Sequence, residues 1–378
     1  MCTNILLKSK NGDAVISART MDFGGDFITK LHKIPRSEKY YDILFNNETE
    51  FTKFKKEFEI TEWENAYGYL STHAYFKVEK WEFEIPTCMD GMNEKGLSGA
   101  TLWMPCADYP KPNITKKNIL SIHLVAYILA TCATVNDVVD KLEGVNVINF
   151  STSLNKFIPQ HFVFSDSKGK SLIVEFKGGK MITHQPTNGV LTNYPFYDKQ
   201  LINLKKYDDL TFENKEYTYC ENDSSKCSQD TNGSGMSGKI EHNGLPGDAT
   251  PKSRFVRASK FSEVNFEATN SQDAVTHIQQ LIQTLQVPVG TIVPNKNNCG
   301  NKNENKNKWD MKNGYDHTKW CVIREHNSFG KINYYYYTND NPTLQKISLD
   351  KIDWEKDSNP IDFEANNKTW YAETNFSS

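Results

Sequence analysis

The second residue carries the most reactive chemistry of this chain, which opens Met-Cys-Thr-Asn. If an aminopeptidase removes Met1, a step that a small second residue favours, the thiol of Cys2 and a free α-amine belong to one residue. The amine can accept a proton near neutral pH, and a cysteine thiolate is a strong nucleophile. Cys2 therefore predicts an N-terminal nucleophile, in which one residue supplies both nucleophile and base. The alternative is an ordinary cysteine that follows the start codon.

A cation and an anion follow in the segment Ala-Arg-Thr-Met-Asp-Phe at residues 18–23. Arg19 and Asp22 are three residues apart, and at the end of a strand both can face one site. We expect Arg19 to support a thiolate and Asp22 to orient the α-ammonium group. The alternative is a surface ion pair, which contributes little to stability.

Two later segments contain polar side chains in unusual places. Asn193 interrupts the apolar run Leu-Thr-Asn-Tyr-Pro, where its amide N–H suits a developing oxyanion, or else a turn before the proline. Arg254 follows the loop Gly-Leu-Pro-Gly-Asp and lies in the first turn of a predicted helix. The helix dipole disfavours a cation there, which suggests that Arg254 has another role.

A hairpin at the start of the chain would bring the first of these residues together. Residues 3–9 and 14–20 are apolar-rich runs joined by Lys-Asn-Gly-Asp, and Asn-Gly is a strong hairpin signal. Cys2 then begins one strand, while Arg19 and Asp22 end its antiparallel neighbour, which runs back towards Cys2. Local geometry alone therefore predicts that the three side chains converge.

The rest of the chain alternates between strand and helix patterns. We expect strands at 97–103, 161–165, 171–176, 181–184, 319–325 and 331–338, and helices at 118–132, 253–261 and 271–287. Thr134, Asp137 three residues later, and Gly144 predict the two ends of one more helix. Strands, then helices, then strands again favour sheets covered by helices over a βαβ series.

We expect one domain, residues 1–378, with two inserted loops. Residues 222–243 are rich in Ser, Gly and Asn, and residues 295–313 are dominated by Asn and Lys, as in surface loops or partly disordered insertions. Cys220 and Cys227 lie in a polar loop and are able to pair, but a reducing compartment is the simpler interpretation of the eight cysteines.

Composition excludes several classes of function. The 44 basic and 47 acidic residues leave a net charge of −3, which argues against nucleic acid as a partner. No apolar run is long enough for a membrane span, and no signal-peptide pattern opens the chain. We expect a cytoplasmic protein, or a periplasmic or secreted one if a signal segment was removed. No Cys-x-x-Cys pair or H-E-x-x-H motif occurs, so we expect no metal and no cofactor.

Five motifs occur in the order that is typical of one family. They are Met-Cys-Thr, Ala-Arg-Thr-Met-Asp-Phe, Asp-Gly-Met-Asn-Glu-Lys-Gly-Leu at 90–97, Leu-Thr-Asn-Tyr-Pro, and Gly-Leu-Pro-Gly-Asp with Ser-Arg-Phe. With these motifs the chain resembles the choloylglycine hydrolase family of bile salt hydrolases and penicillin V acylases, from Cys2 to about residue 349. Thr-Lys-Trp-Cys at 318–321 and the tyrosines at 334–337 look like its C-terminal hairpin. The resemblance implies the four-layer αββα fold of N-terminal nucleophile hydrolases and hydrolysis of a linear, non-peptide amide.

The resemblance also implies a role for each matching residue. Cys2 matches the nucleophile, Arg19 and Asp22 match its two supporting residues, Asn193 matches the oxyanion-hole amide, and Arg254 matches an active-site arginine.

Trp103 departs from the bile salt hydrolase pattern, which has an active-site Asn at this position. Penicillin V acylases of Gram-negative type look similar to this chain in having Trp there, and they carry an aromatic residue where this chain has Phe23. We therefore expect the backbone N–H of Trp103 to be the second oxyanion donor. We also expect Met21, Phe23 and Trp103 to line an acyl pocket. The alternative for Trp103 is packing in the core.

Other functions remain open at this point. One is an amidase with a longer acyl pocket, acting on fatty-acid amides, ceramide-like lipids or acyl-homoserine lactones. Another is a non-catalytic binding protein, which retention of Met1 would indicate because the base would be blocked. We expect a small-molecule amide as the partner. A homotetramer is plausible, since residues 222–243 lie where some relatives carry an assembly segment.

Overall fold

The computed structural model describes residues 1–24, 28–40, 60–77, 84–113, 115–149, 159–212, 244–264, 266–292, 316–356 and 359–363, together with 52, 55 and 56. The inserted loops predicted at 222–243 and 295–313 lie outside these residues, as do Cys220 and Cys227. Among the described residues, no helix has both the length and the hydropathy to cross a membrane.

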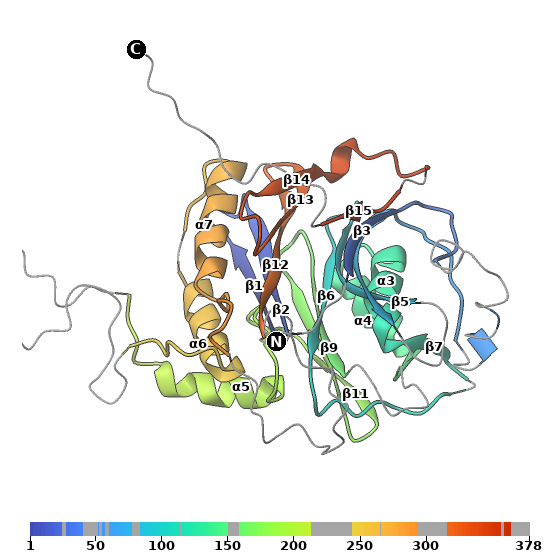
Figure 1. Ribbon diagram of the computed structural model, residues 1–378, viewed down its shortest axis with the longest axis horizontal. Helices are drawn as coiled ribbons and strands as arrows, with labels where there is room; N and C mark the ends of the chain where they lie inside the picture. The colour runs from blue at the N-terminus through green and yellow to red at the C-terminus, as the bar shows by residue number, and fades with distance from the viewer. Residues whose placement is uncertain are drawn as a thin grey trace, which may run out of the picture.

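Two antiparallel sheets form the centre of the molecule (Figure 1). The first has the strand order β1-β2-β12-β13-β14, and the second has the order β11-β10-β9-β6-β5-β4-β3-β15. Helices α5, α6 and α7 lie outside the first sheet, while α3 and α4 lie outside the second (Figure 1). The expected four-layer αββα sandwich is confirmed.

The strands of the first sheet are β1 (Cys2–Lys8), β2 (Val15–Phe23), β12 (His317–Ser328), β13 (Lys331–Thr338) and β14 (Gln345–Ser348). Those of the second are β3 (Ile28–Ile34), β4 (Tyr69–Lys77), β5 (Glu84–Asn93), β6 (Ser98–Trp103), β9 (Gln160–Ser165), β10 (Ser171–Lys177), β11 (Lys180–His184) and β15 (Ile361–Asp362). The strands β7 (Lys117–Leu120) and β8 (Val145–Ile148) form a separate parallel pair.

The helices are α3 (Leu124–Thr131), α4 (Val135–Glu143), α5 (Tyr197–Leu204), α6 (Pro251–Ser262) and α7 (Ser271–Gln283). Short 3₁₀ turns occur at η1 (Ser121–His123), η2 (Lys205–Tyr207) and η4 (Leu349–Lys351).

The N-terminal hairpin forms as predicted. In the antiparallel pair of β1 and β2, Cys2 lies opposite Met21 and Asn4 lies opposite Arg19. Gly12 in the connecting turn has φ = +79°, a value that favours glycine. Strand β2 continues the sheet by pairing with β12, which places Thr318 opposite Asp22.

The helix predicted from Thr134 is confirmed together with both of its ends. The Thr134 side chain accepts from the backbone N–H of Asp137, and the Asp137 carboxylate accepts from the backbone N–H of Thr134, which is a capping box. Gly144 follows as the C-terminal cap.

The helix predicted at 118–132 is wrong in its first part. Residues up to Leu120 form β7, η1 follows, and α3 begins only at Leu124. A short, fully buried apolar run is compatible with a strand or a helix, so its pattern does not distinguish them. The deciding partner is β8, which lies beyond α4 in the sequence and pairs with β7 in parallel.

The helix predicted at 271–287 ends at Gln283, four residues early. Leu285 and Val287 stay buried after the helix has ended, which explains why the apolar pattern continues. The backbone N–H of Val287 donates to the Thr318 hydroxyl at 2.9 Å, and its carbonyl accepts from the Thr318 N–H at 3.0 Å. The chain therefore leaves the helix in order to reach the end of β12.

Both faces of strand β9, in the second sheet, are buried. In β9, Phe162 and Phe164 belong to the apolar cluster under α3 and α4, whereas Val163 belongs to the cluster that continues into the first sheet and α6. This alternation follows from the two-residue repeat of a strand. The two sheets therefore pack against each other, and β1 contacts β6 between them.

Candidate active site

Cys2 is the first residue of β1 and is almost completely buried. Its Sγ lies 3.5 Å from Nη2 of Arg19 and 3.7 Å from Sδ of Met21. Arg19, which we expect to support a thiolate, therefore lies beside the sulfur. The guanidinium group is thus a positively charged neighbour of the sulfur.

Arg19 is buried between the two sheets. Its Nη2 donates to the carbonyl of Thr101 in β6 at 2.8 Å, and its Nη1 lies 3.8 Å from Oδ2 of Asp90 in β5. The guanidinium carbon is 4.8 Å from the centre of the Trp320 ring, which gives a cation–π contact. The side chain of a residue in the first sheet is thus held by groups of the second.

Asp90 is shared by two guanidinium groups. Nη1 of Arg324 lies 3.2 Å from its Oδ2, on the same oxygen that faces Arg19, and the hydroxyl of Tyr334 donates to its Oδ1 at 3.1 Å. Burial raises the pKa of Asp90, while Arg324 and Arg19 oppose that rise. With Asp90 ionised, this buried cluster still contains one more positive than negative charge, close to the Cys2 sulfur.

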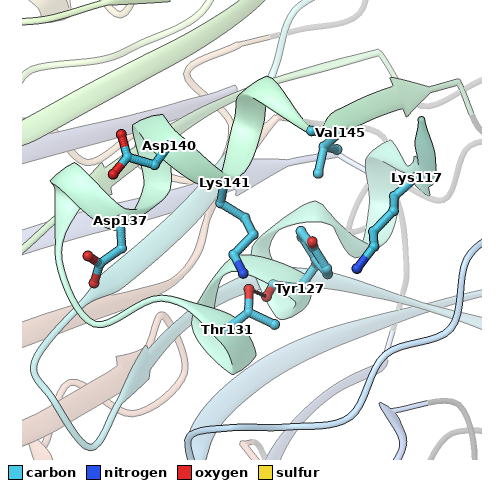
Figure 2. A pocket seen from close by; sticks show the side chains of 8 residues that line it. Lys117, Tyr127, Thr131, Asp137, Asp140, Lys141 and Val145 are labelled. Carbon is cyan, nitrogen blue, oxygen red and sulfur yellow. Dashed lines mark hydrogen bonds between the residues drawn. The ribbon is translucent and has the colours of Figure 1, made fainter. Parts of the chain in front are cut away.

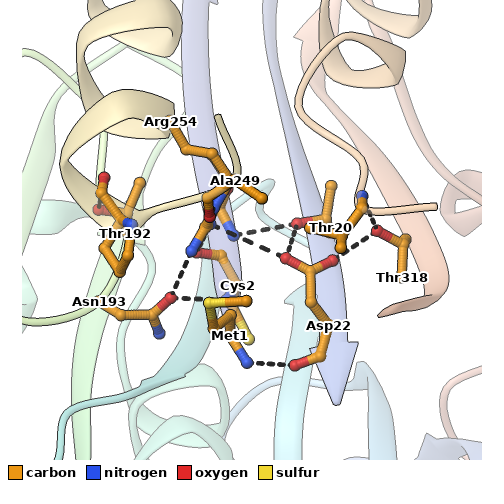
Figure 3. Close-up of polar contacts among 12 residues, drawn as sticks. Met1, Cys2, Thr20, Asp22, Thr192, Asn193, Ala249, Arg254 and Thr318 are labelled. Carbon is orange, nitrogen blue, oxygen red and sulfur yellow. Dashed lines mark hydrogen bonds and ion pairs between the residues drawn. The ribbon is translucent and has the colours of Figure 1, made fainter. Parts of the chain in front are cut away.

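The Asp22 carboxylate is held by two threonines. Thr20 donates to its Oδ2 at 3.1 Å and Thr318 to its Oδ1 at 2.6 Å, and Nη1 of Arg254 lies 3.8 Å away (Figure 3). Its main chain pairs with Met1: the Asp22 N–H donates to the Met1 carbonyl at 2.8 Å, and the Met1 amine donates to the Asp22 carbonyl. While Met1 is present, the α-amine therefore meets the main chain of Asp22.

Asn193 has a fixed orientation beside Cys2 (Figure 3). Its Oδ1 accepts from the backbone N of Cys2 at 2.8 Å and from Nη2 of Arg254 at 2.9 Å. Because both partners only donate, the oxygen must face them, and the amide nitrogen points to the other side. There Nδ2 donates to the carbonyl of Trp103 at 2.8 Å.

Arg254 lies on the first turn of α6 and turns away from that helix towards β1. Its Nη1 donates to the carbonyl of Cys2 at 2.6 Å and to the hydroxyl of Thr3, while its Nε donates to the carbonyl of Ala249 at 2.9 Å. Burial lowers the pKa of Arg254, and the nearby Asp22 opposes that effect. With these contacts Arg254 holds the first peptide of β1 and the Asn193 amide in place, which accounts for a cation at the start of a helix.

The three residues expected to line the acyl pocket differ in their contact with Cys2 and in their exposure to solvent. Met21 contacts the Cys2 sulfur, and Phe23, two residues further along β2, lies on the same face of that strand and is partly exposed. Trp103 has 40% of its surface exposed, so the alternative that it packs in the core is wrong. Its main chain is linked to the site through Asn193.

Four supporting residues were not predicted: Thr20, Asp90, Thr101 and Thr318. Thr20 and Asp22 are two apart in a strand and therefore share a face, which is a signal that the sequence does contain. Asp90 and Thr318 stand inside motifs already noted, but their partners come from other strands. Thr101 contacts Arg19 through its carbonyl, and no side-chain pattern could have indicated that bond.

A second feature of the surface is separate from this cluster. A pocket of about 430 Å³ lies over α3 and α4, on the outer face of the second sheet (Figure 2). It is lined by Lys117, Tyr127, Thr131, Asp137, Asp140, Lys141, Gly144 and Val145. It shares no residue with the surroundings of Cys2. Nowhere among the described residues are three His, Cys, Asp or Glu side chains grouped so that they could hold a metal ion.

Comparisons with known proteins agree on one family. The model of the linear amide C–N hydrolases of the choloylglycine hydrolase family matches residues 2–362. A bile salt hydrolase/transferase of Clostridium perfringens is 30% identical over 285 residues, which are 74% of this chain and 76% of that protein. A penicillin V acylase of Pectobacterium atrosepticum is 26% identical over 373 residues, covering 93% and 82%.

Solved structures show the same fold. A variant of the conjugated bile acid hydrolase from Clostridium perfringens superposes with a TM-score of 0.73 at 24% identity, covering 98% of this chain and 99% of that one. A penicillin V acylase from Agrobacterium tumefaciens gives a TM-score of 0.66 at 22% identity, covering 94% and 88%.

Proposed function

Since this chain belongs to the choloylglycine hydrolase family of linear amide C–N hydrolases, we propose that Cys2 is its nucleophile once Met1 has been removed. The observation that carries the proposal is the convergence of Arg19, Asn193 and Arg254 on the first residue of β1. Each of the three binds a different part of Cys2: its sulfur, its nitrogen and its carbonyl. Such an arrangement orders both functional groups of one residue.

Removal of Met1 would convert the Cys2 nitrogen from a peptide N–H into an amine. Its contact with Oδ1 of Asn193 at 2.8 Å already sets its position. The amine then takes the proton of the Cys2 thiol, directly or through a water molecule. The thiolate attacks the amide carbonyl carbon, forming a C–S bond while the π electrons move to the oxygen.

We propose two donors for the oxygen that gains this charge. One is the second hydrogen of Nδ2 of Asn193, since the first is used by the carbonyl of Trp103. The other is the backbone N–H of Trp103, because the N–H and C=O of a strand residue point to the same edge and the Trp103 carbonyl faces Asn193. Losing one such donor typically lowers the turnover rate by a factor of about 10²–10³.

The second half of the reaction returns the enzyme to its starting state. The protonated amine of Cys2 gives its proton to the leaving nitrogen, the C–N bond breaks, and a thioester remains on the sulfur. A water molecule, deprotonated by the same amine, attacks the thioester carbon and forms a C–O bond. The C–S bond then breaks, the acid is released, and the amine returns its proton to the Cys2 thiolate. The chain supplies the nucleophile, the base and the oxyanion donors from its own residues.

We propose an acyl group with a flat or aromatic part, of the phenoxyacetyl type. The support is Trp103, whose indole is partly exposed while its main chain contacts Asn193. An exposed indole offers a face for stacking. The second candidate is a conjugated bile salt, which the name of the 30% identical relative from Clostridium perfringens favours.

The test begins with intact mass and N-terminal sequencing, followed by assays of the same sample with penicillin V and glycocholate. A Cys N-terminus together with cleavage of penicillin V supports both parts of the proposal. Cleavage of glycocholate alone keeps Cys2 as nucleophile and refutes the acyl preference. A processed N-terminus without turnover of either amide would count against these substrates, and turnover by a protein that retains Met1 would exclude the amine as base.

Trp103→Ala tests the acyl group directly. We expect its KM for phenoxyacetyl amides to rise more than its KM for glycocholate, because only the flat acyl group loses a stacking partner. An equal rise for both would assign Trp103 a general packing role.

A further inference from the structure

Two buried ionisable residues near the site have no part in the reaction described above. His161 in β9 and Glu175 in β10 are both almost fully buried, and Nδ1 of His161 lies 3.2 Å from Oε1 of Glu175. The other ring nitrogen, Nε2, lies 3.0 Å from the carbonyl of Thr192, the residue before Asn193. One imidazole therefore connects a buried carboxylate to the segment that carries Asn193.

The hydrogen-bond roles within this group follow from its chemistry. Burial would raise the pKa of Glu175, but hydrogen bonds from His161 and His184 outweigh that effect and lower the pKa to about 2, so Glu175 is a carboxylate. A carboxylate and a carbonyl can only accept. His161 therefore forms both bonds together only when both ring nitrogens carry a hydrogen, as an imidazolium ion.

Glu175 also holds the far end of the same segment. Both of its carboxylate oxygens accept from the backbone N–H of Tyr197 at 3.1 Å, at the start of α5, and its Oε2 lies 3.0 Å from Nε2 of His184. The turn from Thr192 to Tyr197 is thus attached to the second sheet at both ends, once through His161 and once through Glu175.

Apart from the bonds of the Asn193 side chain to Cys2 and Trp103, this turn also contacts two helices. The hydroxyl of Thr192 donates to the carbonyl of Pro251 at 3.0 Å, and Nε2 of Gln200 donates to the Asn193 carbonyl at 3.2 Å. The oxyanion donors, however, need a fixed distance between Asn193 and Trp103, which belongs to β6. Strand β9 pairs with β6, and His161 lies opposite Leu102, the neighbour of Trp103.

We propose that His161 and Glu175 are positioning residues of the proposed amidase, which hold the Asn193 amide at its distance from Cys2 and Trp103. Nε2 of His161 binds the Thr192 carbonyl, and the Glu175 carboxylate sets the orientation of the ring. Neither residue contacts the substrate. The inference rests on the proposed function, because the step that it serves is stabilisation of the oxyanion.

The test is a double-mutant cycle on purified, processed protein with penicillin V and glycocholate as substrates. We expect His161→Ala to lower kcat by about 10–100-fold with KM within about two-fold, because a small displacement of a positioned group can cost that much. In an Asn193→Ala background the same change should lower kcat by less than about two-fold, since the group that His161 positions is already gone. Where His161→Ala does not give folded protein, His161→Gln, which keeps an amide donor, replaces it in the cycle.

Two further variants separate positioning from general damage. Glu175→Gln should keep most of the activity, because its amide can donate to Nδ1 of a neutral His161, which still donates to Thr192; Glu175→Ala should behave like His161→Ala. The matched control is His326→Ala, at another fully buried histidine, which bonds Ser17 and the Gly96 carbonyl at 2.7 and 2.8 Å. It should lower thermal stability with an equal effect on kcat in both backgrounds.

The outcomes are distinct. A loss of kcat from His161→Ala that is the same with and without Asn193 would overturn the inference and leave a structural histidine. Alkylation of Cys2 by iodoacetamide should proceed at the wild-type rate in His161→Ala, and a slowed reaction would place the damage at the nucleophile, against the inference. If the wild-type protein cleaves neither amide, the proposed function has failed, which is a result separate from any effect of His161.

Discussion

Replacing Asn193 by Asp changes one end of the side chain and leaves its shape. The oxygen that accepts from the Cys2 nitrogen at 2.8 Å and from Arg254 at 2.9 Å remains, and its contact with Arg254 becomes an ion pair. The nitrogen that donates to the Trp103 carbonyl at 2.8 Å becomes an oxygen, so that the donor is lost and a second acceptor faces the carbonyl. The substitution thus removes the proposed oxyanion donor while the nucleophile keeps its contacts.

The expected magnitude follows from that geometry. Loss of one oxyanion donor is worth about 2.7–4 kcal/mol of transition-state stabilisation, or a factor of about 10²–10³ in kcat. A carboxylate beside the developing oxyanion adds repulsion, so the upper end of that range is the expectation for Asn193→Asp. Asn193→Ala should cost about as much for a different reason, since it also releases the Cys2 nitrogen. KM should change little in both variants, because the donor acts mainly on the transition state.

The assay combines steady-state hydrolysis of penicillin V and glycocholate with single-turnover formation of the thioester. Asn188→Asp is the matched control: its Nδ2 donates to Ser259 at 3.0 Å, so the same change deletes one donor in a segment that does not face Cys2. That control should retain kcat within about two-fold. Asn193→Asp with nearly wild-type kcat, or with its whole effect in KM, would refute the assignment of Asn193 to the oxyanion.

Three further outcomes are expected. Cys2→Ser should keep the fold, measured by circular dichroism, and lose nearly all turnover; retained turnover would exclude Cys2 as nucleophile. Thr318→Val deletes the 2.6 Å donor to Asp22 and should lower the free energy of unfolding in urea by about 1.5–3 kcal/mol, whereas an unchanged value would show that Asp22 is held by its other contacts. The Glu175 carboxylate has a pKa of about 2 when folded and 4.5 as its ordinary value. It therefore stabilises the fold above about pH 4.5, and about 3 kcal/mol is lost as the pH falls towards 2. Glu175→Gln should flatten this part of the acid-unfolding curve, and an unchanged curve would contradict the assignment.

Features that depend on near neighbours were predictable from the sequence. The Asn-Gly turn at Gly12 and the cap formed by Thr134 and Asp137 are local hydrogen-bonding arrangements, and the structure has both. The hairpin then placed Arg19 beside Cys2, since antiparallel pairing relates their positions by simple counting.

What the sequence pattern did not indicate depends on partners far along the chain. The run ending at Leu120 became a strand because β8 lies beside it, and α7 ended early because Val287 bonds Thr318. The attachment of Arg19 to the Thr101 carbonyl joins two sheets, and only the stacking of those sheets creates it. Asn193 and Arg254 were indicated by the family resemblance, whereas their bonds to Cys2 required the tertiary structure.

The contact of Arg19 with Thr101 joins the two sheets beside Cys2, so the proposed reaction depends on the distance between the sheets. Arg19 approaches the Cys2 sulfur from the first sheet and is bonded to the Thr101 carbonyl in the second. Thr101 lies two residues before Trp103, whose backbone N–H is a proposed oxyanion donor. Interior side chains such as Val163, which fill the space between the sheets, therefore act as spacers for the chemistry. Removing a methyl group from such a side chain would change no group that contacts the reacting atoms. It would, however, change the distance between the Cys2 sulfur and the proposed oxyanion donors. The turnover rate should therefore depend on how densely the interior is packed.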